Sequence, residues 1–367
     1  MISSAAHTNA VHDIETICFQ DNDSRELRGQ VAARLARLVN WDASCFATMD
    51  PWTLLLTDDV SDRIPPDFYP LAARNEYLMD DVHTFSTLAT TGPRVAILSP
   101  APREKSRPTG RLEPGGTIFG AEQEIRAACV VDGQCWGGIA MFRNSERSGF
   151  STDEAALLQA ISVPLAAGLR RAALRPGAVV GAISEKDGPG VMILGPHNEV
   201  VVTNDAARRW MDKLAPSSGE SSIPLPLAVH QVAERARAHV FSLDDESARL
   251  AEACCRVRTR SGQWLTIRAS PVDDDLFTGK GVAVVIDAAS ASDIAQILML
   301  AHGLTRRERQ VLQRVIAGAP SAGIASQLSI SVNTVQDHLK AIFAKVGVRS
   351  RGQLVAQLLH QHHPPGD

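Results

Sequence analysis

The chain has 367 residues, a length that fits two to four domains. Charged residues make up 21% and hydrophobic residues 44% of the sequence, which is typical of a folded globular protein and argues against intrinsic disorder. The sequence contains no apolar run of about 18 residues and no secretory signal at its N-terminus, so we expect a cytoplasmic protein that makes no membrane contact.

The sequence gives no sign of a metal site or a catalytic centre. None of its cysteines has metal-ligand spacing, so we expect buried free thiols. Cys129 and Cys135 flank an Asp-Gly turn and would point to opposite faces of a hairpin, which argues against a disulfide between them. Phosphate-binding loops, GxSxG and HExxH are absent. We therefore expect no enzyme activity and no metal, and the sequence indicates no cofactor.

Residues 1–175 are predicted to form one α+β domain. It begins with a helix from Ser24 to Val39 and closes with a helix that is capped near Ser151 and runs toward Arg171. Between them we expect strands at 44–49 and 53–57, a helical stretch at 68–90, a strand at 95–98, a loop at 99–116 and a hairpin around residues 132–133.

The order of these elements, the strand Trp136–Phe142 and the Phe150-Ser151-x-x-Glu154 helix start resemble a GAF domain. The resemblance implies that the domain binds a small molecule over its sheet or serves in dimerisation. Four aromatic residues are candidates to line such a pocket, although ordinary core packing explains them as well. They are Trp41, Phe46, Trp52 and Trp136.

Residues 176–290 are predicted to form a second α+β domain. Two strands around a Pro-His-Asn turn lead into a helix at Asn204, and a hairpin around Ser261-Gly262 precedes a last strand. This pattern resembles a PAS domain, which implies ligand binding or signal transmission through a dimer. A haem would need an axial ligand, and we expect His197, His230 and His239 to be exposed instead. A helix within residues 291–303 links this domain to the C-terminal one.

The charge of the chain is unevenly divided. Residues 301–367 hold eight Lys/Arg and three Asp/Glu, whereas the first 300 residues hold 29 basic and 38 acidic residues. A basic C-terminal segment on an acidic body is typical of a nucleic-acid-binding module attached to a second function.

Residues 304–367 are predicted to form an all-α domain of four helices. Thr305 and Glu308 form a capping box at the first helix, and Gly318 ends it. Caps at Ser321, Ser331 and Ser350 begin the other three, and Gly347 ends the third. The short join around residues 329–330 predicts a helix-turn-helix.

The third of these helices carries the predicted DNA-binding face. Val335, Leu339, Ile342 and Val346 form one apolar stripe, which leaves a polar side suited to a DNA major groove. The candidate DNA-binding residues are Ser331, Asn333, Thr334, Gln336, Asp337, Lys340 and Lys345. Candidate phosphate contacts are Arg306, His338, Arg349 and Arg351, each of which also has a purely structural interpretation.

This segment resembles the LuxR-type (NarL/FixJ) helix-turn-helix over its full length. The matches include Leu304-Thr305, Arg307-Glu308, Val311-Leu312, Gly318, Ile324-Ala325, Leu328, Ile330-Ser331, Thr334-Val335, His338-Leu339, Ile342, Lys345, Gly347-Val348, Arg351 and Leu354. The resemblance implies that the third helix reads DNA and that the fourth often supports dimerisation. Gln336 and Ala322-Gly323 replace more polar or charged residues of the family, which predicts weaker non-specific binding.

Three rival interpretations fit the sequence less well. A phosphorylated receiver would need alternating β/α units, and no such alternation follows Asp58-Asp59. An autoinducer-binding domain would be richer in tyrosine than this chain, which has two. A sigma factor would need a second helical region in place of the α+β domains.

We therefore predict a sequence-specific transcription regulator with two α+β sensor domains, GAF-like and PAS-like, before a LuxR-type helix-turn-helix domain. Its expected partners are double-stranded DNA and a second copy of the chain. RNA polymerase and a small-molecule ligand are further candidate partners.

Overall fold

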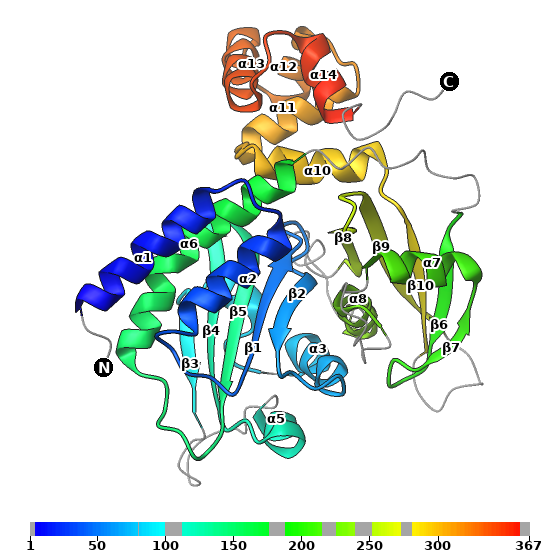
Figure 1. The fold of residues 1–367 in the computed structure, drawn as a ribbon. Coiled ribbons are helices and arrows are strands. Elements are labelled where there is room, and N and C mark those ends of the chain that lie inside the picture. The colour runs from blue at the N-terminus through cyan, green and yellow to red at the C-terminus, as the bar shows by residue number, and fades with distance from the viewer. Residues whose placement is uncertain are drawn as a thin grey trace.

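The computed structural model describes residues 4–79, 81–99, 112–175, 188–214, 225–238, 252–272 and 281–359. Two α+β domains, each with a five-stranded antiparallel sheet, precede a C-terminal all-helical domain (Figure 1). The predicted fold class is confirmed. Counted within its own domain, each sheet has the same strand order, 2-1-5-4-3.

The first sheet is built from five strands in the order β2-β1-β5-β4-β3. They are β1 (Ala43–Met49), β2 (Leu56–Asp62), β3 (Val95–Leu98), β4 (Gln123–Val131) and β5 (Gln134–Arg143). The Asp132-Gly133 turn between β4 and β5 has positive φ at both residues, as a tight hairpin requires. Cys129 and Cys135 belong to clusters on opposite faces of this sheet, and both are free thiols.

Helices cover both faces of the first sheet (Figure 1). One face packs against α1 (Ser4–Phe19), α2 (Ser24–Leu35) and α6 (Thr152–Leu174). The other face packs against α3 (Phe68–Leu78), α4 (Phe85–Thr90) and α5 (Leu112–Phe119). Ser151 and Glu154 form the expected capping box at the start of α6.

The second sheet has the order β7-β6-β10-β9-β8. Its strands are β6 (Gly190–Leu194), β7 (Val200–Thr203), β8 (Cys254–Arg258), β9 (Trp264–Val272) and β10 (Gly281–Ala288), with α7 (Asp205–Leu214) and α8 (Leu227–Ala238) beside them. Helix α8 lies between this sheet and α3 of the first domain (Figure 1). The two domains therefore share a packed interface.

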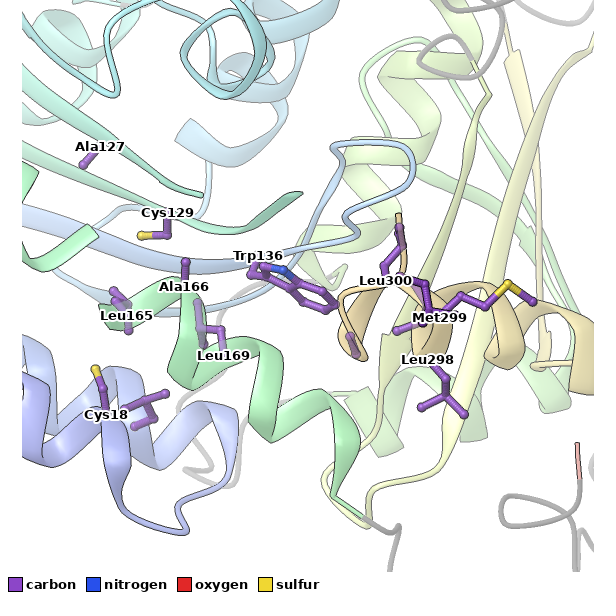
Figure 2. Packing of buried hydrophobic residues seen from close by; sticks show 14 of the residues in the cluster. Cys18, Ala127, Cys129, Trp136, Leu165, Ala166, Leu169, Leu298, Met299 and Leu300 are labelled. Atoms are coloured by element: carbon purple, nitrogen blue, oxygen red, sulfur yellow. The ribbon is translucent and has the colours of Figure 1, made fainter. Parts of the chain in front are cut away.

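Helix α10 (Ala291–Ala301) is much more than a linker. It packs against α6 of the first domain, β8 of the second and the last helix of the C-terminal domain. Its apolar side chains join the core cluster that includes α1 and α6, and Figure 2 shows Leu298, Met299 and Leu300 near Trp136 of β5. The C-terminal domain consists of α11 (Arg306–Ile316), α12 (Ser321–Leu328), α13 (Val332–Val346) and α14 (Arg351–Leu359).

Several local predictions need correction. Strand β2 begins at Leu56 rather than at residue 53, because Leu54 has a left-handed backbone (φ 58°) and Asp50 closes a turn by accepting the Trp52 amide. The helical stretch 68–90 is two helices, and α5 occupies part of the predicted loop at 99–116, of which residues 100–111 lie outside the described residues. Helix α1 was not predicted.

The prediction that His230 is exposed is wrong. Its side chain lies in α8 and is buried beside Asn198, Glu234 and Arg237. His197 is exposed as expected, and His239 lies outside the described residues.

Candidate nucleic-acid interface

The apolar stripe of α13 faces the inside of the C-terminal domain. Val335, Leu339, Ile342 and Val346 are all buried, and α13 packs against α11 and α12. The sequence predicted this stripe because apolar residues recur at helical spacing. It fixes the rotation of α13 and so determines which side chains face away from the domain.

The turn before α13 is short and tightly capped. Helix α12 ends at Ser329, which has a left-handed backbone (φ 53°, ψ 47°). The Ser331 hydroxyl caps α13 by accepting the Thr334 amide at 3.0 Å, as predicted. The prediction that Ser321 caps α12 is wrong: Pro320 holds the cap position, and the Ser321 hydroxyl accepts a hydrogen bond from Gln336 instead.

The outer side of α13 is polar and exposed. Asn333, Gln336, Asp337 and Lys340 are all exposed. Lys340 Nζ lies 3.4 Å from Asp337 Oδ1, but both side chains are about three-quarters exposed, so this pair is weak and easily exchanged. Gln336 Nε2 lies 3.3 Å from Ser321 Oγ and bridges the two helices of the helix-turn-helix. We call Asn333, Gln336, Asp337 and Lys340 the outer face of α13.

Two predicted contact residues have partners within the domain. Lys345 Nζ donates to Glu308 Oε2 at 2.7 Å and to the Gly303 carbonyl at 3.1 Å. Burial opposes ionisation of Glu308, but the hydrogen bonds from Lys345 and Thr305 lower its pKa below the usual value. Arg351 donates to the Ala319 carbonyl at 2.6 Å. Lys345 therefore links α13 to the start of α11, and Arg351 links α14 to the residues that follow α11.

The other predicted phosphate contacts lie at the edges of the domain. Arg306 at the start of α11 and Arg349 before α14 are exposed, and His338 is half-buried next to the outer face. Helix α14 buries Leu354 and contacts both α10 and α11. The side of α14 that meets α10 is therefore covered within the chain.

Of the four aromatic residues proposed to line a sensor pocket, three pack in or against the core and one lines a cavity. Trp41, Phe46 and Trp52 pack in or against the core, with Trp41 Nε1 donating to Asp62 at 3.2 Å. Trp136 lines a cavity between the two α+β domains. A separate cavity of about 50 Å³ lies under α3, between Tyr69, Phe85 and Arg126.

Comparison with known proteins places the C-terminal domain in a family. Residues 302–358 match the family model "Bacterial regulatory proteins, luxR family". The chain is 41% identical over 56 residues to the spore germination protein GerE of Bacillus subtilis, covering 15% of this chain and 76% of GerE. The chain belongs to the luxR family of bacterial regulatory proteins. Residues 302–358 are its DNA-binding domain.

A second luxR-family relative matches over a smaller share of its length. The transcriptional regulatory protein FixJ of Rhizobium meliloti is 41% identical over 78 residues, which is 21% of this chain and 37% of FixJ. The chain thus spans little more than a third of the length of FixJ.

Two solved structures are similar in outline. One is the phycoerythrobilin-bound GAF domain of a cyanobacterial phytochrome, with 13% identity, a TM-score of 0.34, and coverage of 47% of this chain and 98% of that one. The other is Escherichia coli SdiA, with 11% identity, a TM-score of 0.36, and coverage of 97% and 99%. Among the described residues of this luxR-family chain, no helix is long and apolar enough to span a bilayer.

Proposed function

We propose that this luxR-family chain is a sequence-specific transcription regulator that binds DNA through the outer face of α13, acts as a homodimer and responds to a signal received in its first 290 residues. The observation that carries the proposal is the division of α13 into a fully buried apolar side and an exposed side with amide, carboxylate and ammonium groups. Those are the groups that read base edges and touch phosphates.

The proposed contacts are Asn333, Gln336 and Lys340, with Asp337 positioned to accept from a cytosine amino group. Ser331 and Thr334, at the N-terminal end of α13, lie where a helix favours a phosphate. Arg306, Arg349 and His338 are proposed phosphate contacts at the edges. We leave Lys345 and Arg351 out of this surface because their donors are engaged within the domain.

Two observations support a dimer controlled from the N-terminal part. The outer face of the second sheet exposes Val191, Val202 and Val285, apolar side chains that contact with a second copy would bury. Helix α10 touches both α+β domains and α14, so a change at their junction reaches the DNA-binding domain directly. We propose that the signal changes how two copies present their α13 helices to half-sites about 34 Å apart. RNA polymerase is a further partner in this scheme.

The experiment is selection of duplexes from a random-sequence DNA library by the full chain, followed by binding curves of the selected duplex at several salt concentrations. We expect a motif with two half-sites about one helical turn apart. Lys340→Ala should weaken binding and lower the salt slope by about 0.9 for each copy's lost contact, and Gln336→Ala should relax base preference at one position of each half-site.

Lys213→Ala is the matched control, since it removes the same charge from α7 of the second domain. It should bind the selected duplex like the parent. If Lys340→Ala and Gln336→Ala both bind like the parent as well, the outer face of α13 does not read DNA.

A further inference from the structure

A cavity lies where the first domain, the second domain and α10 meet. It has a volume of about 70 Å³ and is lined from β1, β2, β5 and α6, from β8 and β9, and by Ile297 of α10. One water needs about 10–15 Å³ of such space, so this cavity has room for a small organic molecule. We call it the inter-domain cavity.

Three buried donors on the lining have no acceptor in the part of the chain that the structure describes. Trp136 Nε1, Trp264 Nε1 and Arg256 Nε make no hydrogen bond within the described residues. Their residues are only 3%, 9% and 4% exposed, so bulk solvent does not reach them freely. Buried donors are almost always paired, because leaving one unpaired is costly. Three such donors from β5, β8 and β9 around one cavity indicate an occupant that carries acceptor oxygens.

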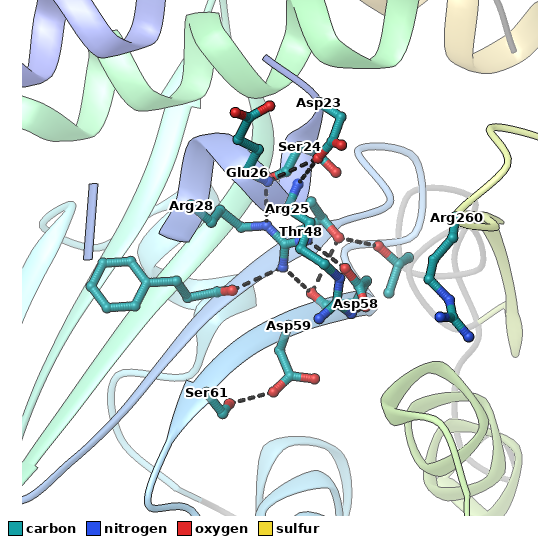
Figure 3. Close-up of polar contacts among 12 residues, drawn as sticks. Asp23, Ser24, Arg25, Glu26, Arg28, Thr48, Asp58, Asp59, Ser61 and Arg260 are labelled. Carbon is teal, nitrogen blue, oxygen red and sulfur yellow. Dashed lines mark hydrogen bonds and ion pairs between the residues drawn. The ribbon is translucent and has the colours of Figure 1, made fainter. Parts of the chain in front are cut away.

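Of the arginines around the inter-domain cavity, Arg258 differs from Arg25, Arg28 and Arg256 in its partners. Arg256 lies opposite Asp50 and Asp293, and Arg25 and Arg28 converge on Asp58 (Figure 3). Arg258, in contrast, has no carboxylate at ion-pair distance among the residues that the structure describes, and its guanidinium lies over the Trp264 ring, 5.4 Å from the centroid.

The donors of Arg258 go to neutral groups. They bond the carbonyl oxygens of Gly262, Ala172 and Arg175 at 3.1, 2.8 and 3.0 Å. Burial and then the nearby Arg175 charge lower the pKa of Arg258 to about 10, against a smaller opposing effect of the Asp23 carboxylate. Arg258 is half-buried and has no ion-pair partner within 4 Å among the described residues, so an anion would be stabilised beside it.

A second hollow lies next to the inter-domain cavity. It is an outer cleft of about 450 Å³, and Arg258, Ser24, Asp58 and Ala172 line both. The cleft is lined by further arginines, and Figure 3 shows Arg260 across from Asp58. A positively charged cleft concentrates anions.

We propose that the inter-domain cavity binds a small monocarboxylate with a short apolar body. The carboxylate would accept from Trp136, Trp264 and Arg256 and compensate Arg258, while the apolar body would contact Leu169 and Ile297. Because Ile297 belongs to α10, a ligand in the inter-domain cavity would contact the helix that leads to the DNA-binding domain. This inference deepens the proposed function and rests on it only for the effect on DNA binding.

The test uses the full chain and the sodium salts of acetate, butyrate, hexanoate and benzoate, with sodium chloride at equal ionic strength as reference. We expect at least one carboxylate to raise the melting temperature and to change tryptophan fluorescence saturably. Its neutral amide should bind at least tenfold more weakly, since it cannot compensate Arg258.

Trp136→Phe and Trp264→Phe keep the ring and remove one N–H each. Each should weaken carboxylate binding by about tenfold or more while leaving the melting temperature of the ligand-free chain nearly unchanged, because that N–H has no partner without a ligand. Trp41→Phe is the matched control: it removes an indole N–H that donates to Asp62 outside the cavity, and it should bind the carboxylate like the parent.

The site proposal is overturned if no carboxylate of the series binds more strongly than chloride, or if the Trp136 and Trp264 variants bind like the parent. Binding of the selected DNA duplex is measured in the same samples. If the carboxylate binds in this cavity and DNA affinity does not change, the ligand site stands and its part in signalling falls. If the chain binds no DNA at all, the proposed function falls, and carboxylate binding still decides the site.

Discussion

His230 is held neutral inside the second domain. Its Nδ1 lies 3.3 Å from Asn198 Nδ2, and the same amide donates to Glu234, which is paired with Arg237 at 2.6 Å. Burial, and then the Arg237 charge, lower the pKa of His230 to about 4. An unfolded chain would protonate this imidazole near pH 6.5, whereas the folded chain resists protonation.

The stability of the parent should therefore fall as the pH is lowered from about 6.5 toward 4, because only the unfolded state gains the proton. At pH 5 the loss from His230 alone is about 2 kcal/mol. His230→Gln cannot be protonated and should show a flatter dependence in urea unfolding between pH 7 and pH 5. His197→Gln, at an exposed position, should follow the parent; equal slopes for parent and His230→Gln would contradict the buried neutral imidazole.

Single residues are also where sequence patterns reach their limit. The spacing of Lys345 on α13 matches the luxR family, and helical geometry alone cannot say whether its flexible side chain reaches outward or back to Glu308. In the structure the Lys345 side chain reaches back to Glu308. The unpaired N–H groups of Trp136 and Trp264 could not be predicted from the sequence either, because they depend on which distant strands meet around one cavity.

At the scale of the elements, two helices of the DNA-binding domain end in the same left-handed conformation with different residues. Helix α12 ends at Ser329 (φ 53°) and α13 at Gly347 (φ 79°). Glycine adopts this conformation without strain, whereas a residue with a Cβ is penalised by about 1–2 kcal/mol. A Cβ at Gly347 would meet nothing within 4 Å, so only the backbone term acts there.

Opposite substitutions at these two ends should therefore have opposite effects. Ser329→Gly should raise the free energy of unfolding by up to about 1 kcal/mol, and Gly347→Ala should lower it by about 1 kcal/mol. Thermal and urea unfolding of both variants measure this directly. Gly352→Ala, inside α14 and without close neighbours, is the control, and should be neutral or slightly stabilising. Destabilisation of the domain by Ser329→Gly would contradict a backbone penalty at Ser329.

The capped helices of the C-terminal domain were predictable because their signals are local. The Thr305–Glu308 capping box, the Ser331 cap and the stop at Gly347 act within one helical turn, and all three occur as expected. The start of β2 was predicted too early because the positive φ of Leu54 and the turn closed by Asp50 leave no clear sequence signal, and the break between α3 and α4 was not predicted. Ser44 pairs with Asp62 across the sheet, and that register is set by the partner strand rather than by residues 53–57.

On the scale of the whole molecule, one buried arginine joins the first domain, the second domain and α10. Arg256 of β8 donates to Asp50 of the first domain and to Gln296 of α10, and it lies 3.8 Å from Asp293 of α10. Burial acts against its charge, yet the field of Asp50 raises its pKa above the usual value. The sequence predicted residues 291–303 as a linker because no local pattern reveals such distant ion pairs.

Asp50 and Asp293 do not touch each other, but they share Arg256, and this predicts that they are energetically coupled. With one carboxylate removed, Arg256 keeps the other; with both removed, a buried cation is stranded, and stranding one is strongly destabilising. Asp50→Asn and Asp293→Asn together should therefore cost more than the sum of the single variants, by about 1 kcal/mol, in a double-mutant cycle measured by urea unfolding.

Asp50→Asn with Asp287→Asn is the matched control pair. Asp287 lies on β10 and forms no ion pair with Arg256, so this pair should add within about 0.5 kcal/mol. Additive behaviour of Asp50 and Asp293 would mean that Arg256 does not link the first domain to α10. A coupling energy larger than that of the control pair would mean that Arg256, which also lines the inter-domain cavity, links the first domain to α10 energetically.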